Sequence, residues 1–174
     1  MTDNPALNTS DSNPEESSAA LCPCGSGTQF LFCCQPAISG QQPAASAERL
    51  MRSRYTAFVQ GEVDYLIATT HPKDRSGLDR ANLIDPQIRW LNLKILKTRK
   101  GGIDDSRGQV QFIATFNESG TFASLEENSH FSNIDQRWYY HTGEARVKAI
   151  KPERNAPCPC GSTQKFKRCC GRPR

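Results

Sequence analysis

Apolar residues recur at helical spacing in the first half of the chain. From Ser46, a suitable N-cap, to about Gln60 they fall on one stripe of a predicted helix, and Gly61 is a suitable stop. The stripe consists of Ala47, Leu50, Met51, Tyr55 and Phe58. The polar residues that we expect to face away from it are Glu48, Arg49, Arg52 and Ser53. A second helix is predicted over residues 63–70, before His71-Pro72, and a third over residues 78–84.

The hydrophobic pattern then changes to alternation. Every second residue is apolar in much of residues 88–98 and 109–117, and further strands are predicted over residues 121–133, 136–140 and 145–150, with a turn at 141–144. Helices followed by a run of strands are typical of an α+β domain with an antiparallel sheet. We place this domain at residues 45–150, after a linker over residues 35–45.

All the cysteines of the chain lie in two matching clusters that flank this domain. Each reads C-x-C-x8-C-C, with Pro, Gly, Ser and Phe at equivalent positions. One cluster lies within residues 21–36 and the other within residues 155–174. The cysteines are Cys22, Cys24, Cys33 and Cys34 in the first, and Cys158, Cys160, Cys169 and Cys170 in the second.

The thiols of each cluster match the ligand set of a tetrahedral structural zinc site. A Pro between the first two cysteines makes a tight turn, and the following Gly-Ser frees backbone N–H groups to donate to the thiolates. Each cluster is too short to hold a core, so a metal ion would largely fold it. We therefore expect two zinc sites, with an iron–sulfur centre as the alternative. A disulfide framework is disfavoured, because the adjacent Cys33 and Cys34 cannot bridge each other without strain.

The cysteine usage also predicts the compartment. No signal peptide is recognisable at the N-terminus, and clustered metal-binding thiols are typical of a reducing environment, so we expect a cytoplasmic protein. No stretch approaches the roughly 18 apolar residues that a membrane-spanning helix needs, and no membrane partner is expected.

The net charge of +4 is unevenly distributed. Residues 1–20 are acidic and poor in large apolar groups, so they are predicted to be a disordered tail. The last ten residues carry basic side chains and no acidic one, which suggests an anionic partner, although such a terminus is often merely solvated. The candidate partner-binding residues are Lys165, Lys167, Arg168, Arg172 and Arg174.

The two clusters differ at one pair of positions. Leu31 and Phe32 of the first correspond to Lys167 and Arg168 of the second. We expect the first cluster to pack on the central domain through its apolar face. We expect the second to reach outward to a partner.

The second cluster resembles a known zinc module. Cys158-Pro159-Cys160-Gly161-Ser162 and Cys169-Cys170-Gly171 resemble the SEC-C motif, first described at the C-terminus of the SecA preprotein-translocation ATPase. There the module binds zinc and contacts the export chaperone SecB and the ribosome. No Walker-type loop occurs in this chain, so the resemblance does not imply the ATPase activity.

The layout of residues 21–170 resembles the YchJ family of uncharacterised bacterial proteins. The resemblance is carried by a SEC-C-like motif at each end and by the segments Arg52-Ser53-Arg54-Tyr55-Thr56-Ala57-Phe58, Asp64-Tyr65-Leu66, Thr70-His71-Pro72 and Arg137-Trp138-Tyr139-Tyr140. It implies a central cone similar to nuclear transport factor 2, in which a curved antiparallel sheet cups the helices and two small zinc knuckles flank them.

A cone of this kind can hold a ligand in its mouth. On the strand over residues 121–133, Glu127 and Ser129 share one face with apolar neighbours, which makes them candidate pocket residues. The other candidates are His71, Trp90 and Tyr139. A buried Glu beside a His could form an acid–base pair. Alternatively, Glu127 pairs with an Arg and His71 simply caps a helix.

Two functions from different classes follow from these features. The first is a non-enzymatic adaptor whose C-terminal knuckle recruits a protein or a ribosome/RNA partner. The second is a small-molecule binding protein or enzyme that uses the cone pocket. No nucleophile elbow, phosphate loop or paired-carboxylate motif occurs, so no catalytic residue is assigned and the balance leans away from an enzyme. Metal storage or sensing would need exchangeable metal, which tight four-thiol sites disfavour.

Overall fold

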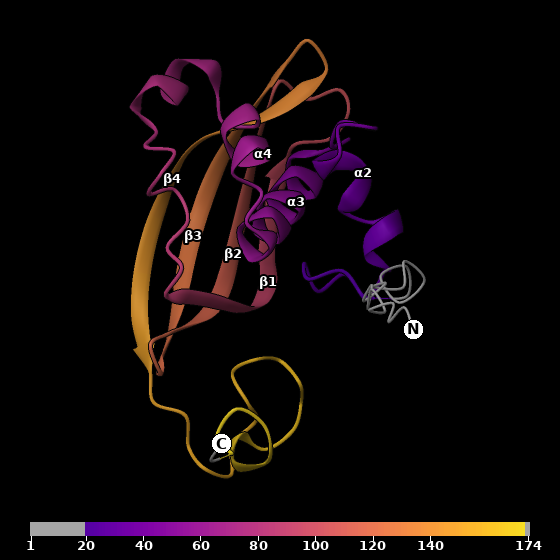
Figure 1. Ribbon diagram of the computed structural model, residues 1–174. Coiled ribbons are helices and arrows are strands. Elements are labelled where there is room, and N and C mark those ends of the chain that lie inside the picture. The colour runs from indigo at the N-terminus through magenta and orange to yellow at the C-terminus, as the bar shows by residue number, and fades with distance from the viewer. Residues whose placement is uncertain (1–19, 173–174) are drawn as a thin grey trace, which may run out of the picture.

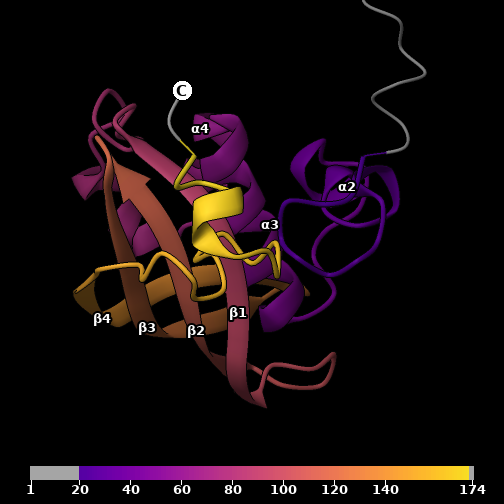
Figure 2. The same cartoon turned by 90° about the horizontal axis from the view of Figure 1, so that it is seen from below.

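The computed structural model of the protein describes residues 20–172. Two helices lie across one face of a curved four-stranded sheet, and a cysteine knuckle lies at each end of the described chain (Figures 1 and 2). The predicted disorder of residues 1–20 falls, apart from Ala20, outside this range. Arg174 is outside it as well.

The long helix α3 (Ala47–Gln60) confirms the prediction from the apolar stripe. The Ser46 hydroxyl accepts a hydrogen bond from the backbone N–H of Arg49, and Gly61 closes the helix with φ 83°. The next helix, α4 (Val63–Ala68), also lies where it was predicted. Leu50 and Tyr55 of α3 pack on the sheet, but Ser53 does not face away as expected. It is buried because α4 covers that side, and its hydroxyl lies 2.6 Å from the hydroxyl of Tyr65.

The third predicted helix, over residues 78–84, does not form. A 3-10 helix, η2 (Pro72–Gly77), precedes these residues, and the fixed φ of Pro72 suits its first position. Residues 78–84 turn because the Asp79 carboxylate accepts hydrogen bonds from the backbone N–H of Ala81 and the amide of Asn82. Such local bonds compete with a helix. The predicted linker over residues 35–45 likewise contains a one-turn helix, α2 (Gln35–Ile38), which follows the 3-10 turn η1 (Phe30–Phe32).

The sheet has the order β1-β2-β3-β4, and all neighbouring strands are antiparallel. Its strands are β1 (Ile88–Lys100), β2 (Arg107–Glu118), β3 (Thr121–Ile134) and β4 (Arg137–Ile150). The last strand corrects a prediction, since no turn interrupts it at residues 141–144. The long β3 pairs with β4 throughout, and the only irregularity is a bulge at His141, where the register passes from His130↔Thr142 to Phe131↔Tyr140.

Candidate functional site

The first cysteine cluster forms a closed knuckle. The backbone N–H of Cys22 donates to the carbonyl of Thr28 at 2.8 Å, and that of Cys33 donates to Phe30 at 3.0 Å from the short turn η1. Gly25 takes φ 71°, which an L side chain rarely adopts, and so folds the chain back between the two cysteine pairs. The sulfurs of Cys24 and Cys33 lie 3.6 Å apart.

The second cluster repeats this geometry. Cys158 donates to Gln164 at 2.8 Å, Cys169 donates to Phe166 at 3.0 Å from the turn η3 (Phe166–Arg168), and Gly161 takes φ 81°. The sulfurs of Cys160 and Cys169 lie 3.5 Å apart. Two segments more than a hundred residues apart therefore have the same local fold.

Both clusters fit a tetrahedral metal ion. In each cluster the four sulfurs lie within 4.8 Å of one another, and none is in a disulfide. Four thiolates at the usual Zn–S bond length of about 2.3 Å would place their sulfurs roughly 3.8 Å apart. The adjacent pairs Cys33–Cys34 and Cys169–Cys170 are both 3.9 Å apart. These thiols could hold zinc without rearrangement of the backbone.

Donors around the sulfurs favour the thiolate form at one cysteine of each cluster, Cys24 and Cys160. Hydrogen bonding raises the pKa of Cys22 and Cys34, and burial raises the pKa of Cys158 and Cys170. Ser26 lies 3.2 Å from the sulfur of Cys33, and Ser162 donates to Cys169 at the same distance. Hydrogen bonding, first from Cys22, lowers the pKa of Cys24. Burial raises the pKa of Cys160, but hydrogen bonds from Ser162 and from the neighbouring Cys158 and Cys169 together outweigh it and lower that pKa to about 6. Deprotonated thiols are the species that bind metal.

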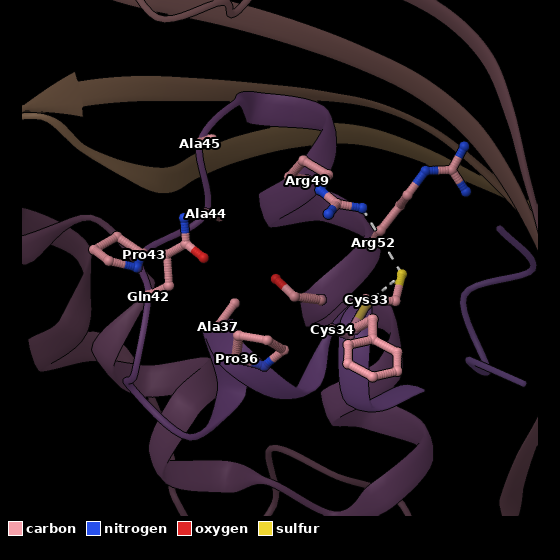
Figure 3. A pocket seen from close by; sticks show the side chains of 12 residues that line it. Cys33, Cys34, Pro36, Ala37, Gln42, Pro43, Ala44, Ala45, Arg49 and Arg52 are labelled. Atoms are coloured by element: carbon pink, nitrogen blue, oxygen red, sulfur yellow. Dashed lines mark hydrogen bonds between the residues drawn. The ribbon is translucent and has the colours of Figure 1, made fainter. Parts of the chain in front are cut away.

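The N-terminal knuckle is built into the core beside α3. All four of its cysteines are buried, Cys22 lies 3.7 Å from the hydroxyl of Thr56, and Arg52 donates to the carbonyl of Cys24 at 3.1 Å. Figure 3 shows Arg49 reaching the sulfur of Cys33, at 3.8 Å, at the edge of a small hollow of about 90 Å³. Arg49 thus places a positive charge beside the sulfur of Cys33.

The prediction that this knuckle packs on the central domain through Leu31 and Phe32 is wrong. Leu31 and Phe32 are 41% and 68% exposed, so they do not mediate the contact with the central domain. The cysteines themselves face α3, and the turn that carries Leu31 and Phe32 is left on the outside.

The C-terminal knuckle also docks, which the outward-reaching hypothesis did not foresee. In Figure 2 the knuckle lies over the ribbon of β1. The ring of Phe166 meets that of Phe122 edge to face at 5.5 Å, and a Cβ at Gly161 would lie 3.1 Å from the side chain of Asn92. Both partners lie on the sheet face opposite the helices. Asn92 pairs with Thr115 and Phe122 pairs with Asn117, and Thr115 and Asn117 share that face of β2 near one end of the sheet. The second knuckle is less buried than the first, because only Cys158 among its cysteines is buried.

The basic residues of the second knuckle remain on its surface. Lys165, Arg168 and Arg172 are exposed and Lys167 is half-buried. The outer face of β1 continues from Asn92 with more basic side chains, all exposed: Lys94, Lys97 and Arg99. Lys97 and Arg99 line one shallow hollow with Gln111, which confirms that they share this face.

A cavity of about 340 Å³ lies between α3 and the inner face of the sheet. Its wall is mainly apolar and aromatic and includes Tyr55, Phe58, Trp90, Phe112 and Leu125. Deep in it Arg54 and Glu127 carry opposite charges, and Asp74 and His141 also line it.

These two charges are held in place by hydrogen bonds. Glu127 accepts one from the buried Ser129 and one from Tyr140 at 3.3 Å. Arg54 donates through Nη1 to the carbonyl of Leu66 and the hydroxyl of Thr69, both at 2.7 Å, and stacks over the ring of Tyr140. Burial lowers the pKa of Arg54 to about 10, and burial together with the charge of Glu127 raises that of Tyr140 to about 12.

Comparison with known proteins agrees with this architecture. A family model described as the middle, nuclear transport factor 2-like domain of YchJ matches residues 46–143, and one for the SEC-C motif matches residues 154–172. The chain belongs to the YchJ-like family. Among its relatives are UPF0225 proteins of Geobacter sulfurreducens (40% identical) and Serratia proteamaculans (44% identical), and each match covers 87% of this chain and 98% of the relative.

Two solved structures share the YchJ-like fold. A SEC-C motif containing protein from Rhodopseudomonas palustris has a TM-score of 0.65 at 38% identity, covering 72% of this chain and 98% of the other. One from Psychrobacter arcticus has a TM-score of 0.65 at 29% identity, covering 90% and 98%. The SEC-C family model matches the second knuckle. The likeness of the first knuckle to a SEC-C motif rests on the backbone geometry that it shares with the second. Among residues 20–172, no helix combines the length and apolarity that crossing a membrane requires.

The pocket candidates of this YchJ-like chain divide into two groups. Trp90, Glu127 and Ser129 line the cavity as predicted. Tyr139 does not, because it points to a separate hollow where its ring centroid lies 5.5 Å from the guanidinium of Arg75. His71 also does not line the cavity, and it accepts a hydrogen bond from the backbone N–H of Lys73 as the cap of η2.

Among the polar cavity residues that sequence reasoning missed are Arg54, Asp74, Tyr140 and His141. Arg54 lies three residues after Met51 on the inward face of α3, so its spacing could have indicated it. His141 was expected in a surface turn, and only the bulge in β4 brings it to the cavity.

Proposed function

We propose that this protein is a zinc-binding adaptor that recruits an RNA-rich partner, such as the ribosome, through its C-terminal knuckle. The observation that carries the proposal is that a knuckle with exposed basic side chains docks beside Asn92 of β1, a strand whose outer face also carries exposed basic side chains. Zinc occupies both cysteine clusters in this proposal, and the reduced thiols favour the cytoplasm as the working compartment.

The two knuckles then have different tasks. The first has its four cysteines buried against α3, so its zinc ion stabilises the central domain. The second is fixed to the sheet by Phe166 and Gly161, which gives its basic side chains a defined position relative to β1. A fixed array of positive charges suits the regularly spaced phosphates of folded RNA better than a mobile tail does.

Binding of purified RNA at several salt concentrations tests this proposal. The test variant carries K165Q, R168Q and R172Q. The matched control carries K73Q, R80Q and R137Q, three exposed basic residues outside both the knuckle and the outer face of β1. Loss of three phosphate contacts should lower the slope of log affinity against log salt by about 2. The control should bind as the wild type does. Equal binding by all three proteins would contradict the role of the knuckle, and binding to an acidic protein alone would contradict RNA as the partner.

The opposite charges inside the cavity favour a second candidate, a small-molecule binding protein. Arg54 is buried and uses Nη1 for all the side-chain hydrogen bonds that it makes within residues 20–172, so its other nitrogens remain for a ligand. A thermal-shift screen of small metabolites should then find a ligand whose effect is lost in E127Q. E126Q, a change of the neighbouring exposed carboxylate on the outer face, is the control. A screen in which E127Q and E126Q respond alike would count against the pocket.

A further inference from the structure

Two of the three histidines of the chain lie side by side at the mouth of the cone cavity. The ring centroids of His71 and His141 are 4.7 Å apart, and the carboxylate of Asp74 is close to both. Its Oδ2 lies 2.7 Å from Nδ1 of His141 and 3.8 Å from Nδ1 of His71. The three side chains are 13%, 39% and 45% exposed for His71, Asp74 and His141, so an ion could reach them from solvent.

The backbone is built to bring these residues together. The segment before η2 pairs with β4 in a parallel bridge between Thr70 and Tyr140. Within it the N–H of His71 donates to the carbonyl of Tyr140 at 2.7 Å, and the N–H of Tyr140 donates to Thr69 at 2.9 Å. The first turn of η2 then carries Asp74 back over both rings.

The bulge in β4 completes the arrangement. In a regular strand, neighbouring side chains point to opposite faces, yet Tyr140 and His141 both line the cone cavity. This is because His141 is the extra residue at the register shift, and a bulge re-aims the side chain that it carries. Bulges are enriched beside functional sites.

We propose that His71, Asp74 and His141 bind a third metal ion, a divalent first-row transition ion, at the mouth of the cavity. Their three ligand atoms lie within 4.8 Å of one another. Two imidazoles and one carboxylate suit zinc, iron, cobalt or nickel, and a set of three protein ligands leaves coordination positions open. Asp74 and His141 line the cavity, so the open positions face the space that also contains Glu127 and Tyr140.

This third site differs in kind from the cysteine knuckles. It has no thiolate, it keeps positions free, and it opens on a cavity that can hold a small molecule. Its ion would therefore exchange more readily than a four-thiol zinc and could bind a ligand directly. The inference does not depend on the adaptor role, because the residues involved lie away from both knuckles.

Metal stoichiometry of the full chain tests the third site. The protein is first saturated with zinc at its knuckles, the bound zinc is counted, and Co²⁺ is then added with calorimetry and visible absorption as readouts. We expect one further equivalent, with d–d bands but without the intense thiolate charge-transfer band of cobalt at cysteine. D74N and H141Q should each weaken this equivalent by at least about tenfold and leave the knuckle zinc unchanged.

The third histidine provides the matched control. His130 lines a hollow with His71 and His141 but is outside their cluster of ligand atoms and contacts Gln109, so H130Q should bind cobalt as the wild type does. Two outcomes would overturn the proposal. One is the absence of any equivalent beyond the knuckle zinc, which would leave a plain His–Asp hydrogen bond. The other is a further equivalent that D74N and H141Q retain.

Discussion

Gly143 makes room for the carboxylate of Glu127, and replacing it with alanine should have opposite effects depending on what stands at position 127. A Cβ at Gly143 would lie 2.1 Å from Oε1 and 2.6 Å from Cδ of Glu127, far inside van der Waals contact. The backbone of Gly143 belongs to the regular strand β4, so alanine itself is not strained there. The carboxylate would have to move.

The size of the effect follows from the bonds of Glu127. Moving the carboxylate breaks the charge-assisted hydrogen bond from Ser129, whose hydroxyl is then buried without a partner, at a cost of about 1.5–3 kcal/mol. Alanine in a strand gains about 0.5–1 kcal/mol over glycine, which offsets part of this cost. G143A should therefore destabilise the wild-type protein by about 1–2 kcal/mol. In an E127A background nothing has to move, and G143A should stabilise by about 0.5–1 kcal/mol.

Urea unfolding of four proteins measures the coupling: the wild type, G143A, E127A and the double variant, all in zinc-containing buffer. We expect a coupling free energy of about 2 kcal/mol and a change of sign between the two backgrounds. If G143A shifts the free energy of unfolding by the same amount in both, the carboxylate does not lie over Gly143. The account of how Glu127 is held in the cavity would then be refuted.

Three further predictions concern the knuckles and the cavity. C24S removes a buried ligand of the first knuckle and should lower the free energy of unfolding of the central domain by about 4 kcal/mol or more. C160S, in the second knuckle, should lower it by less than about 1 kcal/mol. Equal losses in urea unfolding would contradict the division of tasks between the knuckles. F166A should speed protease cleavage within residues 151–157, because the second knuckle loses an edge-to-face contact with the sheet worth about 0.5–1.5 kcal/mol. K165A is the control. If F166A and K165A are cleaved at the same rate, the second knuckle does not dock on the sheet through Phe166. The pKa of Tyr140 is raised to about 12, so between pH 10 and 12 the unfolded chain loses this proton while the folded chain keeps it. The free energy of unfolding therefore falls as pH rises through this range, and the fall should be shallower in Y140F. Identical pH profiles of the two proteins would contradict the burial of the phenol.

Much of the fold was predictable because local signals agreed with the tertiary structure. The cap at Ser46, the apolar stripe and Gly61 together defined α3. Alternation defined β1, β2 and β3, since one face of each strand packs on the helices. The spacing of the cysteines predicted both clusters, because all four ligands of each site lie within one short segment of the chain.

Two predictions of secondary structure were wrong at residues whose type is compatible with more than one local structure. Gly143 was interpreted as a turn residue, but it lies inside β4 and gives space to Glu127. Residues 78–84 were predicted to be a helix, yet the side chain of Asp79 stabilises a turn instead. Neither outcome is visible without the neighbouring atoms.

The docking of the knuckles and part of the cavity also depended on distant residues. Phe166 was recognised as an equivalent of Phe30, but its partner Phe122 lies more than forty residues earlier in the chain. Glu127 and Ser129 were predicted from strand periodicity and Trp90 as an additional aromatic candidate, whereas His141 reaches the cavity only through a bulge that leaves no clear sequence signal.

Co-sedimentation with ribosomes tests the central claim, that the C-terminal knuckle recruits an RNA-rich partner, most directly. The zinc-loaded full chain, a version ending at Glu153 and the K165Q/R168Q/R172Q variant are each spun through a sucrose cushion with ribosomes at low and high salt. The account predicts that the full chain pellets with ribosomes at low salt, is released at high salt, and that both altered proteins stay in the supernatant. Pelleting of all three proteins to the same extent, or of none, would contradict it.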